Sequence, residues 1–354
     1  MKIIHKSILK ELILTFLVSL AFLNFVLMME KLLRLSRFLS GVGASMKDMA
    51  TIIFYMQPQL LLLTIPMAFL LSTLLTYGRH SVDNELLILR TSGMDFKGIS
   101  KPVFILGTSC FLLNIAVSFY IGPKSSMKLR DETINTIKNR TPMAIEVGTF
   151  DTSFKDIVIL IREKPSEDTF RGIFIYDERK KSEPKVMMAR EGRISMSEGF
   201  KVNLYLKDGY IHIAKGDSTT EMYFEGYNLI LALEPDLPSR KNAELTPFEL
   251  MKKIKEKPPH VYLLQIELHR RLTLPLLCII LIFLGPPLSL MAGKSGRLGG
   301  LALGLGVFTF YHMLLIYGEN LVRAHKISHY IGAWTPAVIL GIFALWIFKK
   351  ESNK

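Results

Sequence analysis

The sequence of 354 residues contains only two cysteines, Cys110 and Cys278, and both lie inside long apolar runs. Cysteines in such surroundings are typically small buried hydrophobic side chains, and they indicate no disulfide framework. The sequence also lacks a group of residues with the spacing of metal ligands, and it lacks a nucleophile paired with a base. These absences argue against a metalloenzyme and against nucleophilic catalysis.

Charged side chains are missing from the central portions of six apolar stretches, each of about 18 residues or more, and this length predicts a membrane helix. The stretches are residues 12–29, 49–78, 102–123, 272–293, 298–318 and 331–348. The first is too long for the apolar part of a signal peptide and has no obvious cleavage site. We therefore expect it to remain a span.

Within these spans, His312 is the only titratable residue apart from cysteine and tyrosine. An ionisable residue in a span marks a functional site by default, but a single histidine is more typical of a packed or hydrogen-bonded side chain. The sequence therefore gives little support to a proton relay or an ion-coupled transport site. If the protein works on a substrate, we expect the energy to come from outside this chain.

Charge is abundant elsewhere: the chain is 49% hydrophobic and 21% charged, with mean hydropathy +0.30 and net charge +13. In a membrane protein, an excess of positive charge first points to the topology of the chain in the membrane and to contact with anionic lipid, rather than to binding of nucleic acid. Six spans place both termini on one side, where the short segments carry twelve Lys and Arg against six in the short loops opposite. The positive-inside rule then predicts that both termini lie in the cytoplasm.

A charged island between the second and third spans, residues 79–101, has the pattern of a short amphipathic helix. Ser81 is a preferred N-cap, and Asp83 and Glu85 fall in the expected first turn, where the helix dipole favours negative charge. Gly93 follows the apolar run and is placed to end the helix. Such a helix can lie at the bilayer surface, or it can dock into a cytosolic partner and pass force to both neighbouring spans. Position alone favours neither, but the lack of ionisable residues in the spans favours docking.

The first span continues into a basic segment on the predicted outer side, where Lys31, Arg34 and Arg37 recur at every third residue. On a helix this spacing gives a stripe that drifts slowly around the axis, and it runs against the positive-inside tendency. One interpretation is that the side chains snorkel to the membrane interface. The other is a receptor for an anionic headgroup at the outer leaflet of this membrane, because arginine suits bidentate contact with phosphate.

Between residues 143 and 233 the pattern changes from apolar runs to alternation of apolar and polar residues. β-Branched and aromatic residues, divided by Gly, Asp and Pro turns, predict seven or eight short strands in an antiparallel sandwich or jelly roll on the outer side. No catalytic cluster stands out in this region, and the lone His212 is interpreted as structural. The predicted strands are 155–163, 170–176, 200–207, 210–214 and 221–229, with weaker candidates at 186–188 and 193–197.

The sequence thus predicts a membrane α-helical protein of six transmembrane helices with an inserted all-β, jelly-roll-like domain. Residues 1–123 would hold helices one to three, with the third span ending at Gly122 and Pro123, and would include the coupling helix at 79–101. Residues 124–259 would form the β-domain and its flanking linkers, and residues 260–354 helices four to six.

The order of three spans, a β-domain and three more spans is accompanied by the pattern E-x4-R-x2-G after the second span, here Glu85, Arg90 and Gly93. Four segments add detail: MEKLLRLSRFL, IPMAFLLSTLLTYGRHSVDNELLILRTSG, GPKSSMKLRDE and ELHRRLTLPL. Together these features resemble the LptF/LptG (YjgP/YjgQ) permeases over nearly the whole chain. Those permeases are the membrane subunits of the ABC transporter that extracts lipopolysaccharide in Gram-negative bacteria. The first and third segments make the pattern closer to LptF than to LptG.

The resemblance implies a multi-pass transport subunit of the bacterial inner membrane with a periplasmic β-domain, not an enzyme. Its implied partners are a sister permease, two copies of the LptB ATPase, the LptC β-jellyroll protein and lipopolysaccharide. ATP and Mg would be bound by the ATPase, and this chain would hold no cofactor. The E-x4-R-x2-G residues would belong to the coupling helix that enters the ATPase groove, and Lys31, Arg34 and Arg37 correspond to basic residues near the lipid A phosphates.

Two other classes of protein remain open at this point. A lipoprotein-releasing or FtsX-type permease has a similar cytosolic signature, but it usually has four spans and a large outer domain after the first span. A membrane-bound lipid-modifying enzyme should have a catalytic polar cluster near the interface, and the sequence contains none.

Overall fold

The chain divides into two compact units in the computed structural model. One consists of Met1–Met29, Met56–Met127 and Ser239–Lys354, and the other of Glu30–Tyr55 and Lys128–Pro238. The described residues are 2–41, 44–144, 147–151, 156–166, 168–180, 182–197, 201–215, 218–232, 241–256, 258, 260–293 and 296–353.

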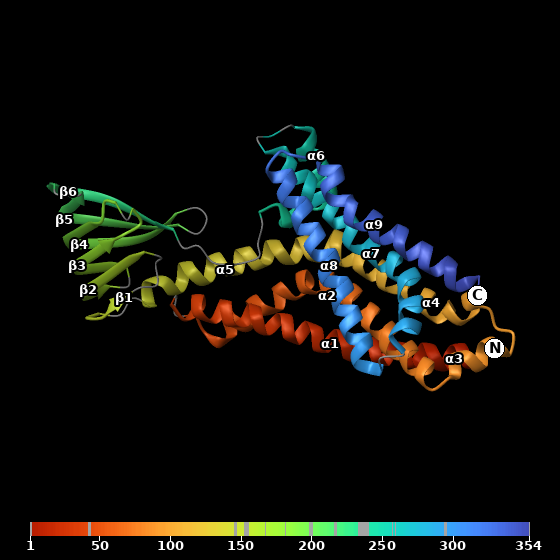
Figure 1. Ribbon diagram of the computed structural model, residues 1–354. Helices are drawn as coiled ribbons and strands as arrows, with labels where there is room; N and C mark the ends of the chain where they lie inside the picture. Colours follow the sequence, from red (N-terminus) through yellow and green to blue (C-terminus); the bar gives the residue numbers. More distant parts are fainter. Residues whose placement is uncertain are drawn as a thin grey trace. The chain divides into compact units, whose positions relative to one another are not determined.

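Six helices among the described residues are long and apolar enough to cross a membrane, as predicted. At a rise of 1.5 Å per residue, about 20 residues span the hydrocarbon core. In Figure 1 these spans are provided by α1 (Lys2–Gly41), α2 (Met46–Val82), α4 (Phe96–Ala116), α7 (Val261–Gly293), α8 (Gly296–Arg323) and α9 (His329–Ser352).

The helices differ in how much of their apolar surface the unit itself covers. The most apolar windows of α2 and α7 are 72% and 67% buried, whereas those of α1 and α8 are each only 22% buried. Close packing depends on small residues, since a Cβ at Gly318 in α8 would lie 2.2 Å from the backbone oxygen of Gly332 in α9. The flanks of α1 and α8 are therefore among the apolar surfaces left for lipid or for another membrane protein.

The helix that carries the third span does not stop at Gly122 and Pro123, where the apolar run ends, but continues into a polar helix. A π-helix, η1 (Val117–Ile121), joins α4 directly to α5 (Gly122–Ala144). Proline normally ends a helix because its ring clashes with the carbonyl one turn earlier, but the wider π turn gives the ring room. Gly122 takes helical angles at this join, and a Cβ there would lie 2.9 Å from the oxygen of Val117.

The all-β domain is confirmed, and it follows the third span. Its described strands form one antiparallel sheet in chain order. They are β1 (Phe150–Asp151), β2 (Ile157–Ser166), β3 (Thr169–Asp177), β4 (Lys185–Ser197), β5 (Lys201–Lys215) and β6 (Ser218–Ala232).

The predicted strand count was too high because two glycines that resemble turn signals lie inside long strands. Gly192 lies within β4, which joins two predicted strands, and Gly209 lies within β5, which joins two more. Both positions are tightly packed: a Cβ at Gly209 would lie 2.2 Å from the oxygen of Met188 and 2.5 Å from the ring of Phe224. These glycines therefore serve close packing within the sheet rather than a turn.

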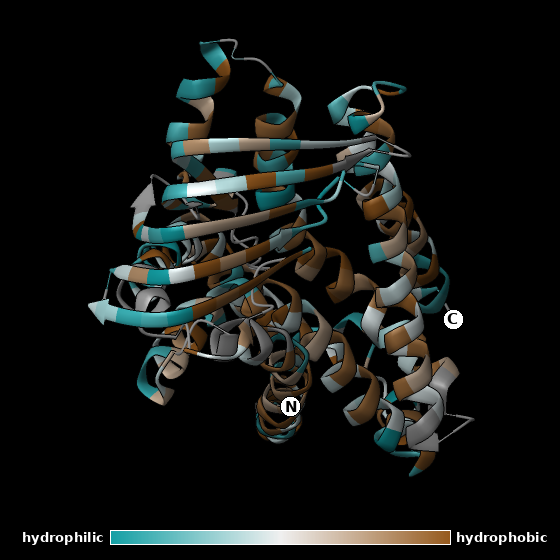
Figure 2. Ribbon diagram, turned by 90° about the vertical axis from the view of Figure 1, so that its left-hand side faces the viewer, coloured by the Kyte–Doolittle hydropathy of each residue, from teal (hydrophilic) through white to brown (hydrophobic). Residues whose placement is uncertain are grey.

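The sheet is curled, and its two faces differ. Arg179, just after β3, donates to the backbone oxygen of Ile230 in β6 at 2.9 Å, although β4 and β5 lie between these strands in the sheet order. Alternation along the strands, visible as teal and brown bands in Figure 2, separates a buried core from the other face. The core residues are Ile157, Ile159, Ile161, Phe170, Ile173, Ile175, Met187, Ala189, Ile194, Leu204, Leu206, Ile211, Leu229 and Leu231.

Candidate functional site

The elbow between the second and third spans is built from three helices, not from the single helix predicted for residues 79–101. Helix α2 continues through Ser81 to Val82, because the amide of Asp83 still bonds to the carbonyl of Arg79 at 2.9 Å. Ser81 is therefore not an N-cap. The chain changes direction at Asn84, which has φ 56°, a left-handed conformation that asparagine tolerates.

The short helix of the elbow, α3 (Glu85–Thr91), ends as the sequence predicted. Gly93 has φ +88°, and its amide bonds to the carbonyl of Arg90 at 3.0 Å. The amide of Met94 bonds to the carbonyl of Leu89 at 3.1 Å. This is the left-handed glycine termination expected of a helix C-terminus.

Glu85 is anchored to the preceding helix. Its Oε2 lies 2.5 Å from Nδ1 of His80, a histidine that is 6% exposed, while the Glu85 side chain is 52% exposed. On the other side of the same imidazole, Nε2 lies 3.4 Å from Oε2 of Glu11 in α1. Arg79 donates to that same Glu11 oxygen at 2.6 Å. These contacts link the elbow helix to both α1 and α2.

Arg90 is turned toward the end of the chain. Its guanidinium lies 5.1 Å from the centre of the Phe96 ring, and Nη2 is 3.7 Å from Oε2 of Glu351 in α9. Both the aromatic face and the carboxylate attract the guanidinium. The two ends of α3 are therefore attached to different membrane helices of the same unit.

The middle of α3 presents an exposed apolar tip. Leu86 is buried, but Leu87 and Ile88 are 59% and 63% exposed. Sequence reasoning identified the charged pair and missed this tip, although four consecutive apolar residues on a seven-residue helix cannot all face inward. The elbow helix is therefore a short element with an exposed apolar surface, and its two ends are fixed to α1, α2 and α9.

The start of α1 and the beginning of α4 are joined beside the elbow. His5 near the start of α1 is hydrogen-bonded through Nε2 to the carbonyl of Gly98 at 2.9 Å, and the hydroxyl of Tyr77 donates to the carbonyl of Ile99 at 2.8 Å. Together with the Arg90–Glu351 pair, these contacts place the start of α1 and the end of α9 beside the elbow. The elbow thus meets α1, α2, α4 and α9.

The basic stripe lies on α1, as the sequence predicted, and belongs to the unit that holds the β-domain. Lys31 is half-buried, whereas the side chains of Arg34 and Arg37 lie outside the described residues. The three positions advance about 9 Å along the helix axis, given 1.5 Å per residue. Their order along α1 is established, and their role in headgroup contact stays a prediction.

A groove of about 990 Å³ follows the face of the sheet opposite the core, and sequence reasoning missed it. Its floor is a row of side chains in direct cross-strand register, one from each strand. The signal was present as apolar residues at positions between the core residues, which made both faces of the strands partly apolar. The row consists of Phe150, Leu160, Phe174, Met188, Tyr210 and Tyr223.

Charged residues lie along one side of this row: Arg162, Arg190, Asp208 and Glu225 also line the groove. The result is an apolar channel with a polar margin of mixed sign. Elsewhere in the described ranges, no three or more His, Cys, Asp or Glu side chains come together where they could hold a metal ion.

Comparison with known proteins gives two findings. The family model described as lipopolysaccharide export system permease LptF/LptG matches residues 6–350. An uncharacterized protein of Rickettsia prowazekii (strain Madrid E), RP871, is 27% identical over 208 residues, which cover 58% of this chain and 57% of the relative. The aligned region thus spans little more than half of that relative's length.

Proposed function

Because the chain belongs to the LptF/LptG family of lipopolysaccharide export permeases, we propose that it extracts lipopolysaccharide from the inner membrane as one subunit of an ABC transporter. Its partners would be a sister permease, a cytosolic LptB-like ATPase dimer that binds ATP and Mg, and an LptC-like β-jellyroll protein that receives the lipid. The chain itself would hold no cofactor and catalyse no reaction.

The observation that carries this proposal is the exposed tip of α3. A seven-residue helix has little stability of its own, so α3 depends on its anchors at Glu85 and Arg90. Leu87 and Ile88 are left in solvent, where an apolar pair is typical of a docking surface. A groove on the ATPase would cover them, and the ATPase would be bound by the element that is tied to α1 and α9.

The anchors give the docked helix a mechanical role. When ATP binding closes the ATPase dimer, a displaced α3 would pull on Glu11 through His80 and on Glu351 through Arg90. Helices α1, α2 and α9 would then tilt together rather than separately. Such motion would compress a cavity shared with the sister permease, for which the uncovered flanks of α1 and α8 are suitable walls.

The headgroup and the acyl chains of the lipid would contact different parts of this chain. The cations Lys31, Arg34 and Arg37 would hold the phosphates by charge-assisted hydrogen bonds. The interior of the β-domain is filled by its own core side chains, so we assign the acyl chains to the groove with the Phe174 and Met188 floor. The transfer of hydrocarbon chains from water to such an apolar surface is favourable in free energy.

The two rival functions have no observation in their favour. The β-domain follows the third span instead of the first, which does not fit an FtsX-type permease. The match of the permease family model to residues 6–350 also favours a transport subunit over a lipid-modifying enzyme.

Purification of the detergent-solubilised chain tests the proposal. We expect a cytosolic ATPase and a second six-span protein to co-purify with it. The double variant Leu87→Asp, Ile88→Asp should lose the ATPase and keep the sister permease, whereas Phe248→Asp, at an exposed position on α6 (Pro247–Lys255), should keep both. A chain that purifies with neither protein would contradict the proposal.

A further inference from the structure

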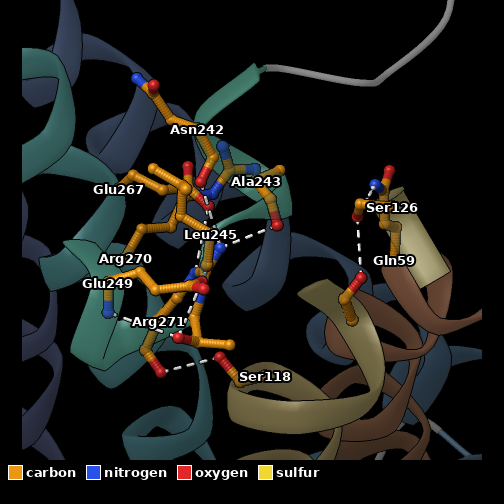
Figure 3. Close-up of polar contacts among 12 residues, drawn as sticks. Gln59, Ser118, Ser126, Asn242, Ala243, Leu245, Glu249, Glu267, Arg270 and Arg271 are labelled. Carbon is orange, nitrogen blue, oxygen red and sulfur yellow. Dashed lines mark hydrogen bonds and ion pairs between the residues drawn. The ribbon is translucent and has the colours of Figure 1, made fainter. Parts of the chain in front are cut away.

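Arg271 lies near the start of α7, one residue before the apolar run of that span, and is 5% exposed. Its guanidinium faces the segment that returns from the β-domain to the membrane (Figure 3). Nη2 donates to the carbonyls of Ala243 at 2.8 Å and Asn242 at 3.3 Å, and Nη1 donates to the carbonyl of Leu245. Nε is 3.4 Å from Oε1 of Glu267, one turn earlier on α7. The buried cation thus contacts three carbonyl oxygens and one carboxylate.

The carbonyls that Arg271 binds belong to a short 3-10 helix, η2 (Lys241–Glu244), and to the residue after it. Carbonyls at the end of a helix lack partners within the helix and favour a cation. The guanidinium of Arg271 supplies both the hydrogen-bond donors and the positive charge. The outgoing segment continues as α6, whose start is closed by a capping box in which Thr246 and Glu249 bond to each other. Hydrogen bonds from Thr246 lower the pKa of Glu249, so this cap is held by a charged carboxylate.

The backbone of Arg271 binds the segment that leads from the third span into the β-domain. Its carbonyl accepts a hydrogen bond at 3.0 Å from the hydroxyl of Ser118, which is 2% exposed and lies in the π-helix η1. That helix leads through α5 into the β-domain. The beginning of α5 is fixed again by Ser126, which accepts from the side-chain amide of Gln59 in α2 at 2.7 Å. Figure 3 draws both contacts.

One residue of α7 thus holds the incoming and the outgoing connection of the β-domain. We infer that Arg271 is a positioning residue that clamps both connections to α7, so that motion of this span is transmitted to the β-domain. The transport part of this inference rests on the proposed function. A π turn suits the incoming side because such turns often mark positions where a helix changes direction.

Arginine is required because the contacts need a planar fork of donors. Five N–H groups in fixed geometry can meet three carbonyls and a carboxylate at once, whereas lysine offers a single ammonium. The neighbouring Arg270 has the same charge but is half-buried rather than buried, and its side chain lies outside this set of contacts. It provides a matched control.

The test uses the full chain in complex with its partner permease and ATPase, with spin labels at Lys207→Cys in β5 and Met291→Cys in α7. Both native cysteines are buried, so the labels go to the introduced positions. Distances between the labels are measured without nucleotide and with ATP. The variants are Arg271→Gln, Arg271→Lys, the milder Ser118→Ala, and the control Arg270→Gln, each first checked for assembly by size exclusion.

We expect Arg270→Gln to give the same distance distribution as the parent, with the same shift on addition of ATP. Arg271→Gln should broaden it and abolish the shift while ATP hydrolysis continues, Arg271→Lys should restore it only in part, and Ser118→Ala should broaden it less. Distributions as narrow in Arg271→Gln and Ser118→Ala as in the parent would overturn the clamp. A parent that never responds to ATP would contradict the proposed function, and the nucleotide-free widths would still decide the clamp.

Discussion

His80 and Glu85 lie 2.5 Å apart, Nδ1 to Oε2, across the bend between α2 and α3. The contact makes Glu85 part of the joint as well as part of the surface that we propose docks on the ATPase. Its substitution therefore changes two interfaces, and the choice of replacement decides which of them is disturbed.

Glu85→Lys should uncouple the ATPase while leaving membrane insertion intact. The new ammonium faces His80 and reverses the charge of the docking surface, and losing a charge pair at an interface costs on the order of 2–5 kcal/mol of association. Glu85→Gln keeps an oxygen that can accept from His80 and should retain the ATPase. Co-purification and ATP hydrolysis measure both variants. Parental hydrolysis and transport by Glu85→Lys would show that Glu85 has no coupling role.

Replacement of Lys31, Arg34 and Arg37 together by Gln should weaken capture of phosphorylated lipid without affecting assembly. Each cation near an anionic lipid surface contributes about 1 kcal/mol, so the loss of three reduces affinity by about a hundredfold. Photo-crosslinking to bis-phosphorylated and dephosphorylated lipopolysaccharide measures the effect.

The matched control for this triple variant is Lys47→Gln, Arg323→Gln, Lys326→Gln, which removes three cations from other loops of the same predicted side. Equal loss of crosslinking to both lipids, or loss to neither, would favour simple snorkelling over headgroup binding.

A photoreactive residue at position 188 of the β-domain should crosslink to lipopolysaccharide acyl chains, and one at position 187 should not. Met188 lies on the groove face, while Met187 is fully buried in the core on the opposite face. Because the residues are adjacent, they share the same local mobility and expression background. Crosslinking at Met187 alone would mean that the sheet opens and that the lipid travels through its interior.

Whether a feature of the fold or of the site could be predicted from the sequence depends on how far apart along the chain its interacting residues lie. The six spans and the glycine stop at Gly93 follow from local patterns. The continuation of α2 past Ser81 and the join of α4 to α5 depend on backbone hydrogen bonds that outweigh capping and proline signals. The carbonyl oxygens that accept from Arg271 lie 26 or more residues away along the chain, where no periodicity can reveal them.

The β-domain should lose stability in acid through Asp177. Burial raises the pKa of this carboxyl, but hydrogen bonds and charge from Arg179 outweigh burial, so the pKa lies below its usual value. In the unfolded chain, the pKa of an aspartate side chain is about 3.9. The stabilisation is therefore complete above about pH 4 and is lost as the pH falls through the lower folded-state pKa.

Hydrogen exchange of the β-domain in the full chain, measured from neutral pH downward, detects this loss. Asp177→Asn should flatten the acid dependence and lower protection at neutral pH, because Arg179 loses a charged acceptor. Asp168→Asn, at an exposed position in the same domain, should behave like the parent. An unchanged acid profile in Asp177→Asn would contradict the assignment.

Both termini and the elbow should face the cytoplasm, with the β-domain on the other side of the membrane. The reason is the excess of twelve over six Lys and Arg in the short segments. Cysteine labelling from one side of sealed cells or vesicles compares Ser352→Cys with Ser218→Cys, and the buried native cysteines give a low background. Labelling of both positions from the same side would rule this topology out.

The most direct test of the central claim is lipid transfer in proteoliposomes that contain the chain, its sister permease and the ATPase. Crosslinking of lipopolysaccharide to a photoreactive residue at Met188 is followed with and without ATP. We predict ATP-dependent crosslinking in the parent and in Phe248→Asp, and none in Leu87→Asp, Ile88→Asp. Crosslinking that is independent of ATP, or that survives the loss of the α3 tip, would contradict the account.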